Sequence, residues 1–232
     1  MMIAGLQKMT LLDYPGKVAC TVFLPGCNFR CPFCQNSGLL DGAPPAMDDA
    51  RLLAFLRSRR GLLDAVCVSG GEPTLSPGLP GLLRSIRSLG FLTKLDTNGT
   101  RPDVLRSLVQ EGLVDHVAMD VKSSPDRYAE AAGCPGLRLE PIEESLRLLR
   151  SGVVSYELRT TVAAELHDVD TIRRMGQWTQ DMGVDPIPAF YLQPFKDGES
   201  VLRQGLHTPD ESSLSAMLEA LRPFAASVAV RG

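Results

Sequence analysis

Hydrophobic positions along this chain follow two alternating periods, one of two residues and one of about 3.6 residues. Short runs rich in β-branched and apolar residues predict strands at 18–24, 65–69, 92–97, 116–122, 156–162 and 189–193, followed by a short run at 227–230. Apolar residues spaced three and four apart predict helices at 48–60, 79–89, 102–111, 141–150, 168–182 and 209–221. Strands and helices are therefore expected to alternate along most of the sequence.

This alternation predicts an α/β fold with parallel strands and right-handed crossovers. Strand, helix and strand recur about six times, which suits either an open doubly wound sheet or a barrel. In both architectures ligands bind at the carboxyl ends of the strands. Motifs that directly follow a strand are therefore the first candidates for chemistry.

Length and charge narrow the class of protein. The chain has 232 residues, with no repeat, low-complexity tract or long linker, which favours a single domain. Its formal net charge is -3, and no run of Lys or Arg indicates a nucleic-acid partner. No apolar stretch is long enough to cross a bilayer and no leader is evident, so we expect a cytoplasmic protein without a membrane partner.

Three of the six cysteines lie within eight residues, directly after the first predicted strand: Cys27, Cys31 and Cys34. A cluster of this kind in a cytoplasmic chain indicates metal binding or redox chemistry. Structural zinc sites and ferredoxin clusters take four ligands. A triplet without a local fourth cysteine therefore indicates a metal centre with one open position.

A structural zinc site completed by Cys20 is the alternative. Strand alternation places Cys20 on the same face as Val22 and Leu24, which is typical of a small buried residue. Cys67, inside another predicted strand, is expected in the core, and Cys134, in a Gly- and Pro-rich turn, is expected at the surface.

Later strands also end in groups suited to a polar ligand. The run 65–69 leads into Gly70, Gly71 and Glu72, where two glycines allow close backbone approach and the carboxylate can accept from an ammonium group. A plain turn with a solvated glutamate is the alternative.

Two more strand ends carry charge. Asp96 and Asp120 each end a predicted strand, and Lys122 lies close to the second of them. Ordinary strand-end carboxylates would also fit this pattern. The nearby lysine, however, makes a compensated charged cluster.

The CxxxCxxC spacing, with the aromatic Phe33 before the last cysteine, resembles radical S-adenosylmethionine (SAM) enzymes. This resemblance implies a [4Fe-4S] cluster on Cys27, Cys31 and Cys34, with S-adenosylmethionine chelating the fourth iron and yielding a 5′-deoxyadenosyl radical. It also implies an incomplete (β/α)6 barrel in one domain. Residues 1–40 would form an extension and cluster loop, and residues 41–232 the partial barrel.

Roles for individual residues follow from the same resemblance. Phe33 would lie near the adenine, and Gly70, Gly71 and Glu72 look like the motif that holds the methionine amine. The segments at 95–99 and 119–122 are similar to glycyl-radical-enzyme activating proteins. By that similarity Asp96, Thr97 and Asp120 would hold a monovalent cation beside the methionine carboxylate. Asp96 and Thr97 would thus take part in cofactor binding, and Lys122 would also reach the cofactor.

Further polar residues fall at the matching depth of the last two predicted barrel strands. They are Arg159, Thr160, Thr161 and Gln193, and they could contact the ribose or the carboxylate. Arg159 suits an ion pair at the rim of the barrel equally well.

The residue types at 12–17 are typical of a turn between two strands, which is the simpler interpretation. Together with residues 25–30 and 35–36, however, they resemble activating proteins of anaerobic ribonucleoside-triphosphate reductase, although many of these have His where this chain has Gln35. The resemblance implies hydrogen abstraction from a glycine of a partner enzyme, with electrons from a reduced flavodoxin or ferredoxin. Asp13 and its loop are candidates to line the entry of the partner's peptide, and pyruvate formate-lyase is another possible target.

Two other functions stay open. One is radical chemistry on a small heterocycle, as in 7-carboxy-7-deazaguanine synthase, and the other is a zinc-binding interaction module. No histidine is needed as a base, because the reactive species belongs to the cofactor. His116, His167 and His207 are therefore expected in structural or exposed positions, and Trp178 in packing.

Overall fold

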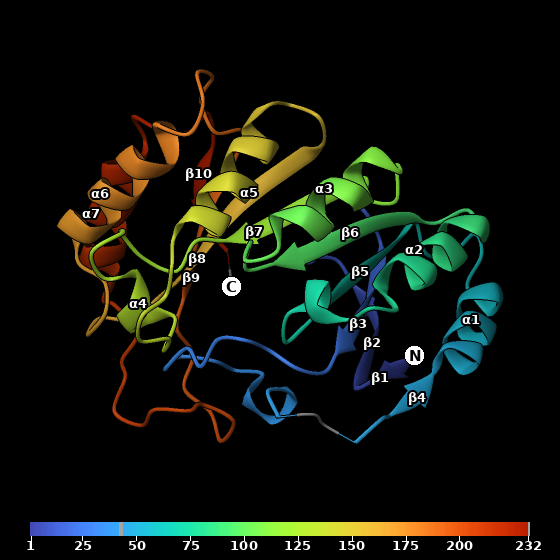
Figure 1. Cartoon of the computed structure of the whole chain (residues 1–232). Coiled ribbons are helices and arrows are strands. Elements are labelled where there is room, and N and C mark those ends of the chain that lie inside the picture. Colours follow the sequence, from blue (N-terminus) through green and yellow to red (C-terminus); the bar gives the residue numbers. More distant parts are fainter. Residues whose placement is uncertain (42–43, 232) are drawn as a thin grey trace. The chain divides into compact units, whose positions relative to one another are not determined.

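The computed structural model describes residues 1–41 and 44–231 (Figure 1). Its contacts divide the chain into two compact units. The first unit consists of Met1–Asn28, Gly38–Thr97 and Arg101–Ala118. The second consists of Phe29–Ser37, Asn98–Thr100 and Met119–Gly232, of which residue 232 lies outside the described part.

The first unit is built on a sheet whose strands run in the order β2-β3-β5-β6-β7. The strands are β2 (Gly5–Thr10), β3 (Ala19–Leu24), β5 (Ala65–Gly70), β6 (Leu92–Thr97) and β7 (His116–Asp120), of which β7 ends in the second unit. β2 is antiparallel to β3, whereas β3, β5 and β6 are parallel. β1 (Met2–Ile3) and β4 (Met47–Asp48) form a separate antiparallel pair (Figure 1).

Helices α1 (Asp49–Ser58), α2 (Leu79–Ser88) and α3 (Pro102–Gln110) connect these strands. Asp48 caps α1 by accepting a hydrogen bond from the Arg51 backbone N–H. Each helix buries one leucine-rich stripe, and α2 packs against β6 (Figure 1). The apolar stripes predicted from the sequence are thus the helix surfaces that are buried in this unit.

The second unit continues with β8 (Ser155–Val162), β9 (Phe190–Pro194) and β10 (Val228–Val230), in the order β7-β8-β9-β10. β8, β9 and β10 are parallel. Its helices are α4 (Tyr128–Ala131), α5 (Glu140–Arg150), α6 (Val169–Gln180) and α7 (Glu211–Leu221). Asp168 caps α6, Asp210 caps α7, and these two helices pack together.

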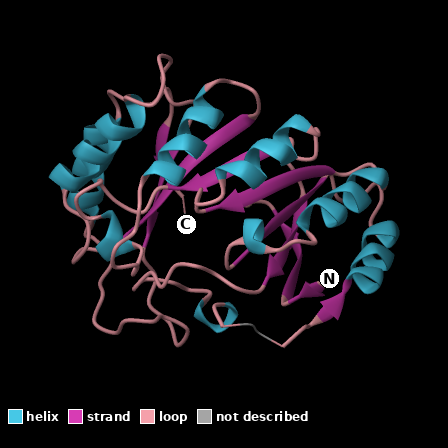
Figure 2. Ribbon diagram, in the orientation of Figure 1, coloured by secondary structure: helices cyan, strands magenta, loops and turns pink. Residues whose placement is uncertain are grey.

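The predicted α/β class is confirmed, and helices and strands alternate along the chain (Figure 2). Every predicted strand and helix is present, with ends shifted by a few residues. The parallel sheet is not closed within the described residues, in keeping with an incomplete barrel. The subdivision at residues 40 and 41 stays a prediction, and residues 42, 43 and 232 within it lie outside the described part.

Strand register gives the sheet of the first unit two different faces. Thr21, Cys67 and Lys94 are neighbours across β3, β5 and β6, and Asp96 follows on the same face as Lys94. The alternate positions carry the apolar residues that face the helices. The face away from the helices therefore carries Thr21, Lys94 and Asp96 next to the apolar Ala19, Ala65 and Leu92.

Two predicted core cysteines are confirmed, because Cys20 and Cys67 are both fully buried. Cys134 is half-buried. Among the helices of the described residues, none combines the length and the apolar character needed to cross a membrane.

Candidate functional site

The turn that follows β5 is shaped by two glycines. Gly70 has a φ of 125°, and a Cβ there would lie 2.2 Å from the Leu24 carbonyl oxygen. A Cβ on Gly71 would lie 2.1 Å from the Gly26 oxygen and 3.2 Å from Cys27 Cβ. Only glycines therefore let this turn lie against the segment that leads into Cys27.

Glu72 is buried beneath this turn, with 1% of its surface exposed. Its backbone N–H donates to the Gly26 oxygen over 2.7 Å. Oε1 accepts from the Thr74 backbone N–H at 3.1 Å and from the hydroxyls of Thr74 and Thr97 at 2.5 and 2.8 Å. The alternative of a solvated glutamate is wrong, because hydrogen bonds fix this carboxylate inside the unit.

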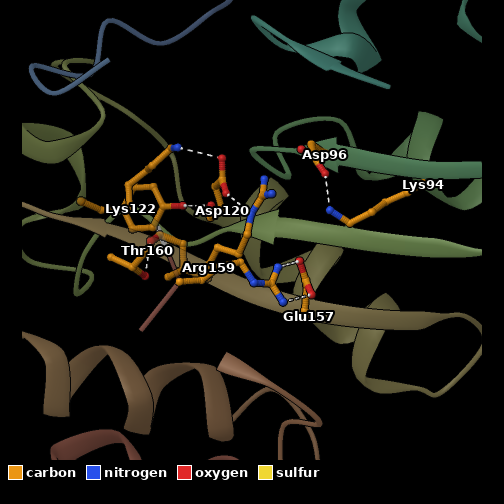
Figure 3. Close-up of polar contacts among 10 residues, drawn as sticks. Lys94, Asp96, Asp120, Lys122, Glu157, Arg159 and Thr160 are labelled. Atoms are coloured by element: carbon orange, nitrogen blue, oxygen red, sulfur yellow. Dashed lines mark hydrogen bonds and ion pairs between the residues drawn. The ribbon is translucent and has the colours of Figure 1, made fainter. Parts of the chain in front are cut away.

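The end of β6 holds an ion pair. Lys94 is completely buried, and its Nζ lies 2.8 Å from Asp96 Oδ1 (Figure 3). Thr97, the next residue, is also buried. Sequence reasoning missed Lys94, although strand alternation places it on the same face as Asp96.

In the second unit, a three-residue charged cluster joins the end of β7 to Arg159 in the middle of β8. Arg159 Nε donates to Asp120 Oδ1 at 2.9 Å, and Lys122 Nζ lies 3.1 Å from Asp120 Oδ2 (Figure 3). Burial alone would lower the pKa of Lys122, but the neighbouring Asp120 and Cys31 raise it above its usual value. The predicted charged cluster of Asp120 and Lys122 is confirmed. Arg159 forms an ion pair, which was one of the two roles predicted for it.

The cysteine loop divides between the units, with Cys27 in the first and Cys31 and Cys34 in the second. The Cys34 backbone N–H donates to the Cys31 oxygen at 3.0 Å, which makes a tight turn. Phe33 is buried, with Lys122 Nζ 6.0 Å and the His167 ring 6.1 Å from its ring centroid. Phe33 and Lys122 therefore lie together, as a shared cofactor site would require.

The donor set of this loop suits an iron–sulfur cluster. Thiolates are the ligands of such clusters, and none of the cysteines at residues 1–41 and 44–231 forms a disulfide. The missing Cβ of Gly71 lets the backbone of Gly26 and Cys27 lie directly against this turn. Over the same residues, no three His, Cys, Asp or Glu side chains form a ready-made metal site.

A small polar pocket of about 130 Å³ lies at the ends of β8 and β9. Thr161 and Gln193 are register partners across these strands. The lining residues are Gln35, Thr161, Gln193, Pro194, Lys196 and Arg231. Thr160 instead donates its hydroxyl hydrogen to the Val121 oxygen and lies 3.4 Å from Met175 Sδ, toward α6.

Comparison with known protein families shows which superfamily the chain belongs to. The profile of the radical SAM superfamily matches residues 21–162, which include the cysteine loop and every strand end described above except that of β9. This chain belongs to the radical SAM superfamily. Radical SAM proteins use a [4Fe-4S] cluster and S-adenosylmethionine.

Two relatives and one solved structure are similar to this radical SAM protein. It is 30% identical to the "Putative glycyl-radical enzyme activating enzyme" of Methanocaldococcus jannaschii, over 99% of this chain and 95% of the relative. It is 28% identical to a 7-carboxy-7-deazaguanine synthase of Hyperthermus butylicus, over 94% and 80%. The crystal structure of a domain of the pyruvate-formate lyase-activating enzyme from Bacteroides vulgatus matches with a TM-score of 0.60 and 19% identity, covering 72% of this chain and 99% of that domain.

Two histidines and the tryptophan have structural contacts. His167 is buried, and its Nδ1 accepts from the Ala163 backbone N–H while Nε2 lies 2.8 Å from the Lys122 oxygen. Burial lowers the pKa of His167. His116 lies against the Tyr14 ring, and Trp178 packs edge-on against Tyr128.

The third histidine, His207, is exposed and lies 2.6 Å from Glu165 Oε1.

Proposed function

We propose that this radical SAM protein activates a glycyl-radical enzyme, and that its partner is anaerobic ribonucleoside-triphosphate reductase. The observation that carries the activating role is the match with the Methanocaldococcus jannaschii relative, which covers 99% of this chain and 95% of that protein. The reductase as partner rests on the resemblance of residues 12–17, 25–30 and 35–36. When bound, the cluster and S-adenosylmethionine supply one-electron chemistry that abstracts a hydrogen atom. The protein's own residues bind and orient these groups.

Cys27, Cys31 and Cys34 would hold the cluster and leave one iron open to S-adenosylmethionine. Glu72 would accept the methionine ammonium group, because its carboxylate is buried and its Oε1 is fixed by Thr74 and Thr97. The glycine turn supports this arrangement, since Gly71 lies beside Cys27.

In the second unit Phe33 would offer a ring face to the adenine. Lys122 remains protonated because Asp120 and Cys31 raise its pKa, so it can pair with the ligand's carboxylate. Arg159 and Gln193 remain candidate contacts for the ribose or the carboxylate. Gln193 lines the polar pocket together with Thr161.

A protein substrate fits the surface around Asp13. Met9, Leu11 and Leu12 precede it and are 64%, 68% and 65% exposed. Apolar side chains clustered in this way at the surface are typical of contact sites for other proteins. Asp13 itself accepts a hydrogen bond from the Thr21 hydroxyl at 2.5 Å, so its position is fixed by the face of the sheet that carries Thr21.

The electron donor stays a prediction, namely a reduced flavodoxin or ferredoxin. The cytoplasmic location also stays a prediction.

Electron paramagnetic resonance tests the proposal. Reconstituted protein, reductant and S-adenosylmethionine are mixed with anaerobic ribonucleoside-triphosphate reductase, and a glycyl signal is expected. The control is reductase in which the radical-bearing glycine is replaced by alanine. A signal with pyruvate formate-lyase and none with the reductase would refute the target but keep the activating role.

Radical chemistry on a small heterocycle is the second candidate. The polar pocket near Gln193 and the 28% identity with a 7-carboxy-7-deazaguanine synthase favour it. Formation of 7-carboxy-7-deazaguanine, without a glycyl signal from any partner, would decide for this alternative.

A further inference from the structure

Both carboxylates predicted to bind a monovalent cation already pair with cationic side chains of this protein (Figure 3). Lys94 Nζ lies 2.8 Å from Asp96 Oδ1 in the first unit. In the second unit Arg159 and Lys122 hold the two oxygens of Asp120, at 2.9 and 3.1 Å. Each carboxylate therefore has a positive charge of the protein beside it.

The Lys94 pair is built into the interior of its unit. Lys94 is fully buried, and the Asp96 side chain is only 12% exposed. A buried ammonium group needs a charged partner, because burial removes its hydration. Alternation along β6 directs both side chains to the face of the sheet that carries Cys67. This pair is therefore a fixed part of the strand end rather than a mobile surface contact.

The two cationic side chains that contact Asp120 are also mostly buried, although Asp120 itself is 28% exposed. The Arg159 side chain is 11% exposed and that of Lys122 is 13% exposed. Arg159 keeps its charge at all ordinary pH values. Asp120 is thus neutralised by groups that cannot diffuse away.

Thr97, the third predicted cation ligand, uses its hydroxyl hydrogen in a bond within the protein. The Thr97 hydroxyl donates to Glu72 Oε1 at 2.8 Å, and Thr97 is 3% exposed. An added potassium or sodium ion at Asp96 would also stand close to the Lys94 ammonium, and like charges at such short range repel.

We propose that Lys94 and Arg159 serve as built-in counter-ions for Asp96 and Asp120, so that this protein binds S-adenosylmethionine without a monovalent metal cation. The inference rests on the S-adenosylmethionine site of the proposed function. Lys94 is a positioning residue, since it acts through Asp96, and in its counter-ion role Arg159 acts through Asp120. The partner enzyme plays no part in it.

Binding of S-adenosylmethionine to the reconstituted protein tests the inference. The dissociation constant is measured by anaerobic equilibrium dialysis while potassium or sodium replaces choline at constant ionic strength. For the wild-type protein we expect a change of less than about twofold. A saturable gain in affinity of about fivefold or more, the range of ordinary coupling between two ligands, would overturn the proposal.

The Lys94→Met variant sharpens the test. It removes the ammonium group and keeps an unbranched side chain, so a potassium ion could now approach Asp96. We expect weaker binding in choline and a recovery of about fivefold or more in potassium. Lys94→Arg should restore binding without potassium. A Lys94→Met protein that binds equally well in both media, with wild-type affinity, would contradict the proposal.

Arg87→Met is the matched control. Arg87 pairs with Asp115 in the same unit but lies outside the strand-end site, and it is half-buried whereas Lys94 is fully buried. We expect its binding of S-adenosylmethionine to remain independent of potassium. If Lys94→Met does not fold, the wild-type measurement alone still decides the question.

The outcomes separate this inference from the proposed function. Cation-independent binding without activation of any partner would leave the inference standing and refute the activating role. Activation that strictly requires potassium, together with potassium-dependent binding, would refute the inference and keep the role. No binding of S-adenosylmethionine in either medium would refute both.

Discussion

Thr97, the last residue of β6, donates its hydroxyl hydrogen to Glu72 Oε1 over 2.8 Å. This contact joins the end of one strand to the turn after its neighbour. Glu72 is 1% exposed and Thr97 3%, so water does not compete for the bond. The carboxylate that would receive the methionine ammonium group is thereby oriented before any ligand arrives.

Replacing Thr97 with valine should loosen Glu72. The variant keeps the shape of the side chain but loses one donor to a buried carboxylate, which costs about 1–3 kcal/mol of unfolding free energy. Urea unfolding measures that loss, and equilibrium dialysis should show weaker binding of S-adenosylmethionine. Thr97→Ser retains the hydroxyl and should preserve both properties. Equal losses in the serine and valine variants would show that the hydrogen bond is not responsible.

Gly71→Ala should damage the cysteine loop. The new Cβ would lie 2.1 Å from the Gly26 oxygen and 3.2 Å from Cys27 Cβ, so the segment before Cys27 must shift. We expect less iron per chain after reconstitution and a lower melting temperature. Gly81→Ala in α2 is the control, because no atom lies within 4 Å of its Cβ and alanine stabilises a helix by up to about 1 kcal/mol. Normal iron content in Gly71→Ala would contradict the proposed position of the cluster.

Serine at Cys27, Cys31 or Cys34 should remove most of the bound iron. Each substitution deletes one of the three proposed thiolate ligands. Iron analysis and the visible absorbance of the anaerobically reconstituted protein measure the effect. Cys134→Ser should retain the cluster, because Cys134 lies in a turn outside the loop. Iron loss in Cys134→Ser alone, or stoichiometric zinc in the wild type, would exclude the assigned ligand set.

Stability should fall at alkaline pH because of Cys20. Burial raises the pKa of this thiol from 9.0 to about 12. Between these values the unfolded chain releases the proton while the folded chain keeps it, so the unfolding free energy declines as pH rises, by up to about 1.4 kcal/mol per pH unit for one such group. Urea unfolding across this range measures the slope, and Cys20→Ala should make it shallower. Identical slopes would assign the alkaline loss to other groups.

Much of the fold could be predicted from hydrophobic period alone. Each predicted β-rich run forms a strand and each predicted apolar stripe forms a helix, because the apolar period of a segment is a local property of the sequence. β2 was implied only by the turn predicted at residues 12–17, and its range was not predicted, since its Gln7, Lys8 and Met9 are exposed and lack an alternating apolar pattern.

The strand-end residues were also predictable, but their contacts were not. A lysine in a strand gives no local sign of burial, so Lys94 was found only when Asp96 was seen beside it. The same holds for Arg231, whose guanidinium pairs with Glu157 from 74 positions away. Such pairings depend on which strands become neighbours, and that is decided by the whole chain.

Transfer of deuterium from the partner's glycine to 5′-deoxyadenosine tests directly whether this protein abstracts hydrogen from the reductase. The partner reductase is prepared with glycine deuterated at Cα and incubated with the reconstituted protein, reductant and S-adenosylmethionine, and the 5′-deoxyadenosine formed is analysed by mass spectrometry. We expect one deuterium in the 5′-deoxyadenosine, together with a glycyl signal on the reductase. Unlabelled 5′-deoxyadenosine, formed at the same rate with and without the reductase, would contradict this expectation.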